Sequence, residues 1–415
     1  MRVVGLITEY NPFHNGHRHH LRESLRLAGA QASVAVMSGN FLQRGEPALL
    51  DKWARCEMAL ASGVDLVLEL PFAFACSSAP HFALGAVQTL DALGVVDSLS
   101  FGSEAGEIEP LEQIANELFT HADEIEDATR QMLRQGINYP TARAAVLKQR
   151  LPQLNPSLVA SPNNILGIEY LKALCALSSS IKPYTLPRIG ADFHSVEAVG
   201  SIASATGIRQ RLNQGEAVRE LMPPAVHSVL ERQQQAGQLL DIDKLFSQLL
   251  AHLLQASQTL REISQVEAGL EVRLTKAAMT VTSYQELVAA VKSRQWTATR
   301  IQRILSYVLM QAQAEEVRQF QAQGPLYLRL LGATERGQQI LALSRKRRTL
   351  PFIHDPAKAK NVLGRFYRNQ TELERVAQRM LAYDLRATRL HGLMLRTPLT
   401  GHRNRDFFMP PLVLP

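Results

Sequence analysis

Cysteine is scarce in this chain of 415 residues, and its three cysteines form no recognisable pattern. Cys56, Cys76 and Cys175 are an odd number, and none lies in a CxxC pair or beside histidines at metal-site spacing. Each lies in an apolar context, which favours a buried thiol. The sequence therefore argues against a disulfide framework and a cysteine-based metal site. It fits a reduced, cytoplasmic compartment.

Long hydrophobic runs are also lacking. The most apolar stretch, residues 64–76, is interrupted by two acidic residues and a proline. It is shorter than the ~20 apolar residues that a membrane-spanning helix needs. The apolar start of the chain, residues 3–7, meets a glutamate and a proline within five residues, too early for the core of a signal peptide. We expect neither a membrane segment nor an export signal.

Acidic residues are few in the last third of the chain. Residues 291–415 hold 22 Lys and Arg against 8 Asp and Glu, a balance of +14, whereas the whole chain carries +7. Residues 1–290 therefore carry −7. A basic C-terminal part on an acidic body favours a polyanionic partner, such as a nucleic acid, bound by one part of the molecule.

The first hundred residues alternate short apolar runs with helical patterns. The runs expected to be buried strands are Val3–Ile7, Ser33–Met37, Leu66–Leu70 and Ser98–Phe101. The helices expected between them are His17–Ala28, Lys52–Ala61 and Pro80–Leu93. Gly29, Gly63 and Gly94 follow the three helix ends, where a left-handed cap residue is favoured. This order predicts a parallel sheet with right-handed crossovers.

The rest of the chain is mostly helical in pattern. A helical stretch of about 110–180 precedes a further short strand, Tyr184–Ile189, and a helix that begins near Thr206. Beyond Pro223 the amphipathic segments are Leu239–Leu254, Ser283–Lys292 and Thr297–Ala314. We therefore predict an α/β fold with a Rossmann-like parallel-sheet domain (1–223, with a helical insertion at about 110–180). A mostly α-helical, basic domain (224–415) follows it.

The first strand leads directly into an HxGH motif, with His14, Gly16 and His17 at its fixed positions. A helix N-terminus offers unpaired N–H groups and a partial positive charge, which suit a phosphate. Gly16 allows close approach to the backbone, and the two histidines can turn toward one phosphate. Attack on the α-phosphate of ATP needs reactants held in line and charge neutralised rather than an enzyme nucleophile. We expect the histidines to stabilise the transition state.

A second anion site is predicted where Ser204, Thr206 and Arg209 surround the start of another helix. Small hydroxyl residues cap a helix, and an arginine in its first turn suits the β- and γ-phosphates or pyrophosphate. Together with HxGH, this segment resembles the HxGH nucleotidyltransferase superfamily. It looks like the Ser/Thr–Ile–Arg signature of the adenylyltransferases and departs from the lysine-rich loop of the aminoacyl-tRNA synthetases.

Longer segments resemble one family within that superfamily, the tRNA(Met) cytidine acetate ligases. The similar segments are Gly5–His20 (GLITEYNPFHNGHRHH), Met37–Gly63, Ser161–Tyr170 (SPNNILGIEY) and the basic C-terminal part. The resemblance implies an enzyme that uses ATP and acetate to form acetyl-adenylate. It then acetylates N4 of the wobble cytidine in elongator tRNA(Met).

The same resemblance implies an ATP-binding set, in which Asn163 is preferred to its neighbour Asn164. This set comprises Ile7, Thr8, Glu9, Tyr10, Asn11, Pro12, Phe13, His14, Asn15, Gly16, His17, Arg18, His19, His20, Gly102, Asn163, Arg188, Ser204, Thr206 and Arg209. Gly102 also lies at the carboxyl end of a strand, where α/β sheets bind ligands. Mg²⁺ is expected with the triphosphate, although no metal-ligand cluster is visible.

Lys52 and Arg55 open the second predicted helix, next to the dense polar stretch that begins at Gln43. Either could face ATP or the carboxylate, and we predict Lys52 as a third catalytic residue beside His14 and His17. Asp51 is expected to cap that helix.

Basic residues alternate with aromatic ones in the C-terminal part, which suits phosphate contacts and base stacking in an RNA loop. The predicted tRNA-binding residues are Arg345, Lys346, Arg347, Arg348, Arg365 and Arg368, with Phe366 and Tyr367 between the last two.

Two other functions remain open from the sequence. One is a cofactor-forming adenylyltransferase that acts on a phosphorylated small molecule, which leaves the basic helical half unexplained. The other is an RNA-binding protein with a degenerate nucleotide fold. The intact HxGH motif and Ser204–Arg209 segment argue against it. Neither the choice of carboxylate nor the oligomeric state follows from the sequence.

Overall fold

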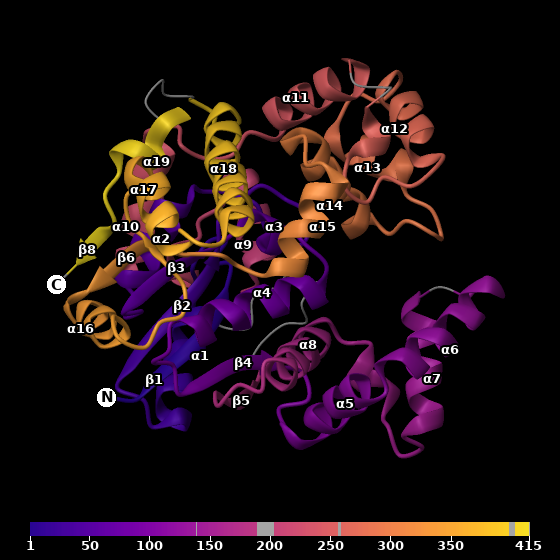
Figure 1. Ribbon diagram of the computed structural model, residues 1–415. Helices are drawn as coiled ribbons and strands as arrows, with labels where there is room; N and C mark the ends of the chain where they lie inside the picture. Colours follow the sequence, from indigo (N-terminus) through magenta and orange to yellow (C-terminus); the bar gives the residue numbers. More distant parts are fainter. Residues whose placement is uncertain (138, 189–202, 256–258, 398–402, 415) are drawn as a thin grey trace.

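The computed structural model describes residues 1–137, 139–188, 203–255, 259–397 and 403–414, and a mostly parallel sheet runs through it (Figure 1). Within these residues the sheet has eight strands in the order β5-β4-β1-β2-β3-β6-β7, with β8 also paired to β6. The strands are β1 (Val3–Thr8), β2 (Ala32–Ser38), β3 (Leu66–Leu70), β4 (Ser98–Ser103), β5 (Lys182–Pro187), β6 (Leu328–Thr334), β7 (Phe352–Ile353) and β8 (Leu412–Leu414).

Strands β1 to β5 are parallel, as the sequence predicted. The chain builds β1, β2 and β3 outward in one direction and then returns to the other side of β1 for β4 and β5. The direction of winding therefore reverses between β1 and β4. Open α/β sheets bind ligands at the carboxyl ends of the strands beside such a switch point.

The crossovers between the first four strands are helical. They are α1 (Asn15–Ala28), α2 (Lys52–Leu60), the short α3 (Phe72–Ala75) and α4 (Ala79–Ala92). Gly29, Gly63 and Gly94 have φ values of 56°, 103° and 72°, so the predicted left-handed positions after these helices are confirmed. Asp51 caps α2 by accepting a hydrogen bond from the Ala54 N–H, as expected.

Helices occupy the stretch between β4 and β5, where the sequence pattern is helical. They are α5 (Glu109–Thr120), α6 (Ala122–Arg134), α7 (Tyr139–Arg150) and α8 (Pro162–Ala176). Helix α8 packs against α4 and α5, whereas α6 and α7 extend away from the sheet (Figure 1).

The second half of the chain is rich in helices. They are α9 (Ala205–Asn213), α10 (Pro224–Gln235), α11 (Ile242–Gln255), α12 (Leu270–Ala278), α13 (Tyr284–Val291), α14 (Ala298–Met310), α15 (Ala314–Gln323), α16 (Glu335–Ser344), α17 (Ala359–Phe366), α18 (Thr371–Leu393) and α19 (Arg405–Phe408). The helix predicted over 297–314 ends at Met310, because Gln311 adopts a left-handed φ of 48°. None of the described helices is long and apolar enough to cross a membrane.

Strands β6, β7 and β8 were not expected, since the pattern beyond residue 223 is helical. Strand β6 pairs antiparallel with β3, with Leu66 opposite Ala333 and Glu69 opposite Arg329. The sequence of β6, LRLLGAT, is a short and mostly apolar run, and such a run cannot be distinguished from a piece of buried helix by periodicity alone. Consequently, the sheet combines strands from both sides of residue 223, and the two-domain division remains a prediction.

The strands bury side chains on both faces. Along β1, Val3 belongs to the core under α4, α5 and α8, whereas Val4 and Leu6 belong to the core under α1, α2 and α10. Packing on both faces thus fixes the position of β1, and with it the position of the segment that follows β1 at the carboxyl ends of the strands.

Candidate active site

A cavity of about 590 Å³ lies at the carboxyl ends of β1, β4 and β5, where the switch point predicts a ligand site. The predicted ATP-binding residues that line it are Ile7, Thr8, Glu9, Tyr10, Asn11, His14, Gly16, His17, His19, His20, Gly102, Asn163, Arg188, Ser204, Thr206 and Arg209. Its volume lies within the range of small-molecule sites, about 300–1,000 Å³.

The two motif histidines form a reciprocal cap at the start of α1. His14 Nδ1 accepts a hydrogen bond from the Gly16 N–H (3.1 Å), and His17 Nδ1 accepts one from the His14 N–H (3.3 Å). Both Nδ1 atoms are therefore acceptors, so the ring proton of each neutral imidazole lies on Nε2. The two ring centroids are 3.7 Å apart. The helix start thus presents two oriented Nε2–H donors together.

Burial keeps these histidines neutral. It lowers the pKa of His14 to about 3, with a further contribution from the charge of Arg188. Burial also lowers the pKa of His17 well below its usual value, with His14, His20 and Arg188 acting in the same direction. Neutral imidazoles donate hydrogen bonds without delivering a proton, so they suit stabilisation of negative charge on a phosphate.

The second predicted anion site borders the same cavity. Ser204 caps α9 by accepting a hydrogen bond from the Gly207 N–H (3.0 Å), and Thr206 lies beside it in the lining. Arg209 donates to the Asn11 carbonyl oxygen (2.9 Å), which ties α9 to the loop before His14. The N-termini of α1 and α9 therefore both open onto one cavity, which suits the separate phosphate groups of a triphosphate.

Arg188 and Asn163 form a polar part of the same cavity wall, next to Gly102. Arg188 Nη1 donates to Asn163 Oδ1 (3.3 Å), and Asn163 Nδ2 donates to Glu104 Oε1 (2.7 Å). Asn164 is buried away from the cavity, and its Oδ1 accepts a hydrogen bond from the Ala105 N–H. This arrangement favours Asn163 over Asn164 as a ligand contact.

Four members of the predicted ATP-binding segment do not line the cavity: Pro12, Phe13, Asn15 and Arg18. Phe13 is fully buried and packs against Tyr10 and His17, with ring centroids 4.8 and 5.5 Å away. Asn15 Nδ2 donates to the Glu220 carbonyl oxygen. These two residues thus support the loop and the start of α1 from behind.

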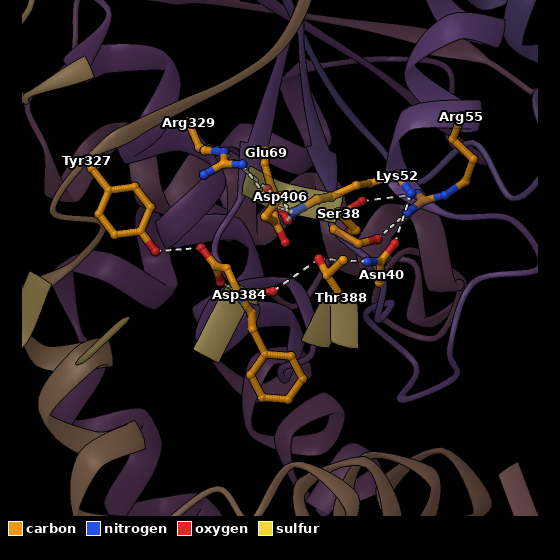
Figure 2. Close-up of polar contacts among 12 residues, drawn as sticks. Ser38, Asn40, Lys52, Arg55, Glu69, Tyr327, Arg329, Asp384, Thr388 and Asp406 are labelled. Carbon is orange, nitrogen blue, oxygen red and sulfur yellow. Dashed lines mark hydrogen bonds and ion pairs between the residues drawn. The ribbon is translucent and has the colours of Figure 1, made fainter. Parts of the chain in front are cut away.

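Lys52 was expected to face ATP or the carboxylate, and this expectation is wrong. Its side chain is fully buried in an ion cluster, with Nζ 2.7 Å from a Glu69 oxygen and 2.9 Å from Asp406 Oδ1 (Figure 2). Arg329 contacts the same Asp406 oxygen at 2.8 Å. The partners lie on β3, β6 and α19, up to 354 residues along the chain from Lys52, so no local pattern reveals them.

Arg55 also has a structural role. Its guanidinium donates to the carbonyl oxygens of Glu9 (2.7 Å) and Ser38 (3.0 Å). It therefore braces the ends of β1 and β2 instead of meeting a ligand.

The loop between β2 and α2 contributes residues to the cavity that the sequence prediction missed: Leu42, Gln43, Arg44 and Glu46. The polar stretch from Gln43 was the available signal, but Lys52 was chosen from it. An apolar wall of Ala79, Phe82, Phe101, Ile165, Leu166 and Tyr170 was also missed. Its members come from three separate segments, and each reads as ordinary core in the sequence.

The predicted tRNA-binding residues lie apart from this cavity. Arg345, Lys346 and Arg347 are exposed, and Arg348 lies over the Phe352 ring at 5.2 Å. The Arg347 backbone packs on Gly94, just beyond the end of α4. The opposite end of that helix, Ala79, lines the cavity. A 14-residue helix is about 20 Å long, so this basic segment lies near the amino ends of the parallel strands, at the end of the sheet opposite the cavity.

Arg365 and Arg368 are exposed beside the half-exposed Phe366. Tyr367 was expected to be available for base stacking, and this is wrong. It is buried, and its hydroxyl donates to the Leu326 carbonyl oxygen (2.9 Å). Only Phe366 of the two aromatics is accessible to a base.

Within the described part of the chain, no group of three or more His, Cys, Asp or Glu side chains is arranged to hold a metal ion. Any Mg²⁺ that enters with a triphosphate would take phosphate oxygens and water as most of its ligands.

Comparison with known proteins identifies the family. A family model described as HIGH Nucleotidyl Transferase matches residues 1–406. The tRNA(Met) cytidine acetate ligase of Syntrophotalea carbinolica is 51% identical over 415 residues, covering 99% of each chain. The enzyme of that name from Alkaliphilus metalliredigens is 39% identical over 428 residues, covering 99% of this chain and 98% of the relative.

Solved structures agree. The crystal structure of Thermotoga maritima TmcAL bound with alpha-thio ATP is similar over 100% of both chains, with a TM-score of 0.91 and 34% identity. The apo form of that protein gives a TM-score of 0.92. With its HxGH cap, its second anion site and full-length similarity to these proteins, the chain belongs to the tRNA(Met) cytidine acetate ligase family of HIGH nucleotidyltransferases.

Proposed function

We propose that this enzyme uses ATP to activate acetate as acetyl-adenylate and transfers the acetyl group to N4 of the wobble cytidine in elongator tRNA(Met). The observation that carries the proposal is the convergence of two helix N-termini, α1 and α9, on one cavity whose histidines are neutral donors. The names of the full-length relatives supply the acetate and the tRNA.

In the first step, a carboxylate oxygen of acetate attacks the α-phosphate and pyrophosphate leaves. Negative charge develops on the α-phosphate oxygens, and the Nε2–H groups of His14 and His17 are oriented to receive it. Ser204, Thr206 and Arg209 around the start of α9 suit the departing pyrophosphate. Arg188, Asn163 and Gly102 then remain for the nucleoside part of ATP.

In the second step, the exocyclic amine of cytidine attacks the acetyl carbonyl carbon and AMP leaves. We infer that Mg²⁺ enters with the triphosphate. We also infer a cytoplasmic location, which the use of tRNA and ATP supports.

Acetate-dependent ATP–pyrophosphate exchange by the purified enzyme, with and without tRNA, tests the first step directly. We expect exchange with acetate alone, together with incorporation of labelled acetate into elongator tRNA(Met). Exchange with no small carboxylate would contradict the proposal, particularly if adenylyl transfer to a phosphorylated small molecule were found. That outcome would favour the cofactor-forming adenylyltransferase.

A further inference from the structure

The transfer step requires a proton acceptor. The lone pair of a cytidine amine is delocalised into the ring, so the amine becomes nucleophilic only as it loses a proton. The leaving AMP keeps the bonding electrons on its phosphate oxygen, and that oxygen is a weak base. A side chain lining the cavity is therefore expected to take the proton.

The two motif histidines are unsuited to this role. Each uses Nδ1 to accept a backbone N–H, and each carries its ring proton on Nε2, the atom left to face a ligand. Neither offers a free nitrogen lone pair to a ligand. They can hold the adenylate phosphate, but they cannot accept a proton without breaking the cap.

His20 is the next candidate, because its Nε2 is buried without a hydrogen-bond partner in the described structure. It lies six residues beyond His14 on α1, which places it about 9 Å further along the axis. Its neighbours in charge are Arg188 and His19. Burial, with the charges of Arg188 and His19, lowers its pKa to about 4, so His20 is a weak base.

Two carboxylates line the cavity, Glu9 and Glu46. Glu46 is already engaged, since its Oε1 accepts from Gln302 Nε2 (2.9 Å) and its Oε2 lies 3.6 Å from Arg209 Nη2. Glu9 Oε1 accepts one hydrogen bond, from the Gln43 N–H at 2.7 Å, and within the described residues Oε2 has no hydrogen-bond partner.

Glu9 is also well placed. It follows β1 directly, in the turn that leads to the histidine cap, and its backbone carbonyl is held by Arg55. The charges of Arg209, Arg55 and Arg44 act on the Glu9 carboxylate. The charge of Glu9 in turn acts on Tyr170 of the apolar wall. Glu9 thus lines the same cavity as the two helix starts and the apolar wall.

We propose that Glu9 is the general base of the acetyl-transfer step and accepts the proton lost by cytidine N4. This inference rests on the proposed function. As the N4–carbon bond forms, the bond between the acetyl carbon and the phosphate oxygen breaks, and AMP leaves with the electron pair. The N4 proton moves to Glu9 Oε2 and then to water. Burial raises the pKa of Glu9, against the hydrogen bond from the Gln43 N–H and the charges of Arg209, Arg55 and Arg44. A higher pKa makes a carboxylate a stronger base.

The test separates the two half-reactions in the Glu9→Gln variant, which keeps the size and an oxygen to accept the Gln43 N–H. Because Glu9 also belongs to the predicted ATP-binding set, acetate-dependent ATP–pyrophosphate exchange should fall as well, but at least about 10-fold less than transfer does. Single-turnover transfer from preformed acetyl-adenylate to elongator tRNA(Met) should fall about 100-fold or more, the usual scale of a general base. Glu9→Asp should recover part of the transfer rate.

The pH profile gives a second readout. Only the deprotonated carboxylate accepts a proton, so the wild-type transfer rate should rise with pH through the raised pKa of Glu9 and then level off. The Glu9→Gln variant should lose that limb. A purely structural role for Glu9 would lower the rate without changing the shape of the profile.

Glu46→Gln is the matched control, since it neutralises the other carboxylate of the cavity. Both half-reactions should change together there, because Glu46 contacts Arg209 of the pyrophosphate site. Equal losses of exchange and transfer in Glu9→Gln would overturn the proposal, as would a selective loss of transfer in His20→Gln instead. Absence of exchange in the wild-type enzyme would instead contradict the proposed function itself. That outcome is therefore distinct from a failure of the Glu9 proposal.

Discussion

At the scale of single residues, the chemistry depends on which nitrogen of each histidine carries the proton. The capping geometry of His14 and His17 fixes that choice with backbone atoms alone. The HxGH spacing therefore has a role in folding besides the catalytic role that we propose for it. In both histidines, Nδ1 accepts a backbone N–H at the start of α1, which leaves Nε2–H available to a phosphate.

His17→Ala should reduce acetate-dependent exchange by about 10²–10³-fold, the usual cost of one donor to developing negative charge. Loss of the cap bond should lower the free energy of unfolding by only about 1 kcal/mol. Exchange kinetics and urea unfolding measure both. Arg22→Ala, an exposed residue on α1 outside the cavity lining, is the control. Unchanged exchange in His17→Ala would remove the motif from the mechanism.

The buried histidines also predict acid sensitivity. The pKa of His14 falls from 6.5 to about 3 and that of His20 to about 4, so the unfolded chain binds more protons between these values and 6.5. Stability should therefore fall as pH drops below about 6.5, by about 1.4 kcal/mol per pH unit for each histidine involved. His14→Gln should show a shallower slope between pH 6.5 and 4 in urea unfolding. An unaltered slope would mean that the lowered pKa of His14 does not cause the loss of stability at low pH.

At the scale of elements, the cluster in Figure 2 connects α2, β3, β6 and α19 through paired charges. Lys52 and Arg329 share Asp406, which lies on the last described helix. Removing one partner of a buried ion pair leaves an uncompensated charge in a medium that solvates it poorly. The docking of α19 therefore depends on the cluster.

Asp406→Asn should lower the free energy of unfolding by about 3–5 kcal/mol. Glu315→Gln breaks an exposed pair with Arg318 and should cost at most about 1 kcal/mol. Guanidinium unfolding of the two variants provides the comparison. Similar losses in both would mean that the buried cluster contributes no more than a surface pair.

The same elements explain what could be predicted from sequence. The parallel strands and the glycines after their helices follow from short apolar runs and local backbone geometry, so β1 to β4 were predicted to within two residues at each end. The fifth strand was predicted over Tyr184–Ile189, two residues later than β5, and Ile189 lies outside the described residues. Strand β6 and the burial of Lys52 depend on pairings between residues 260 or more positions apart, such as Glu69 with Arg329. Local periodicity carries no trace of such partners. The sequence predicted the helix starts that line the cavity, but it did not predict the apolar wall.

At the scale of the whole molecule, the basic segment from Arg345 lies about one helix length from the cavity. A tRNA is long enough to contact both places. We therefore keep these residues, with Arg365 and Arg368, as the predicted tRNA surface.

Reversing the charges of Arg345–Arg348 should weaken tRNA binding and reduce the dependence of log Kd on log salt by about 0.7–0.9 per lost phosphate contact. Filter binding across a KCl series measures both quantities. The reversal of Arg130 and Arg134 on α6 serves as the control, since both are exposed and distant in the fold (Figure 1). A larger effect from the α6 variant would move the RNA surface to the α5–α7 region.

The antiparallel pairing of β6 with β3 also has a consequence for synthesis of the chain. Strand β3 is complete once residue 70 has been made, yet its partner ends at residue 334. At about 5–20 residues per second, the ribosome needs roughly 13–53 s to bridge that interval. Throughout that time the β3 edge and the Lys52–Glu69 pair wait for partners, and such open edges attract other chains. The nascent enzyme is therefore a natural client for chaperones that shield unpaired strands.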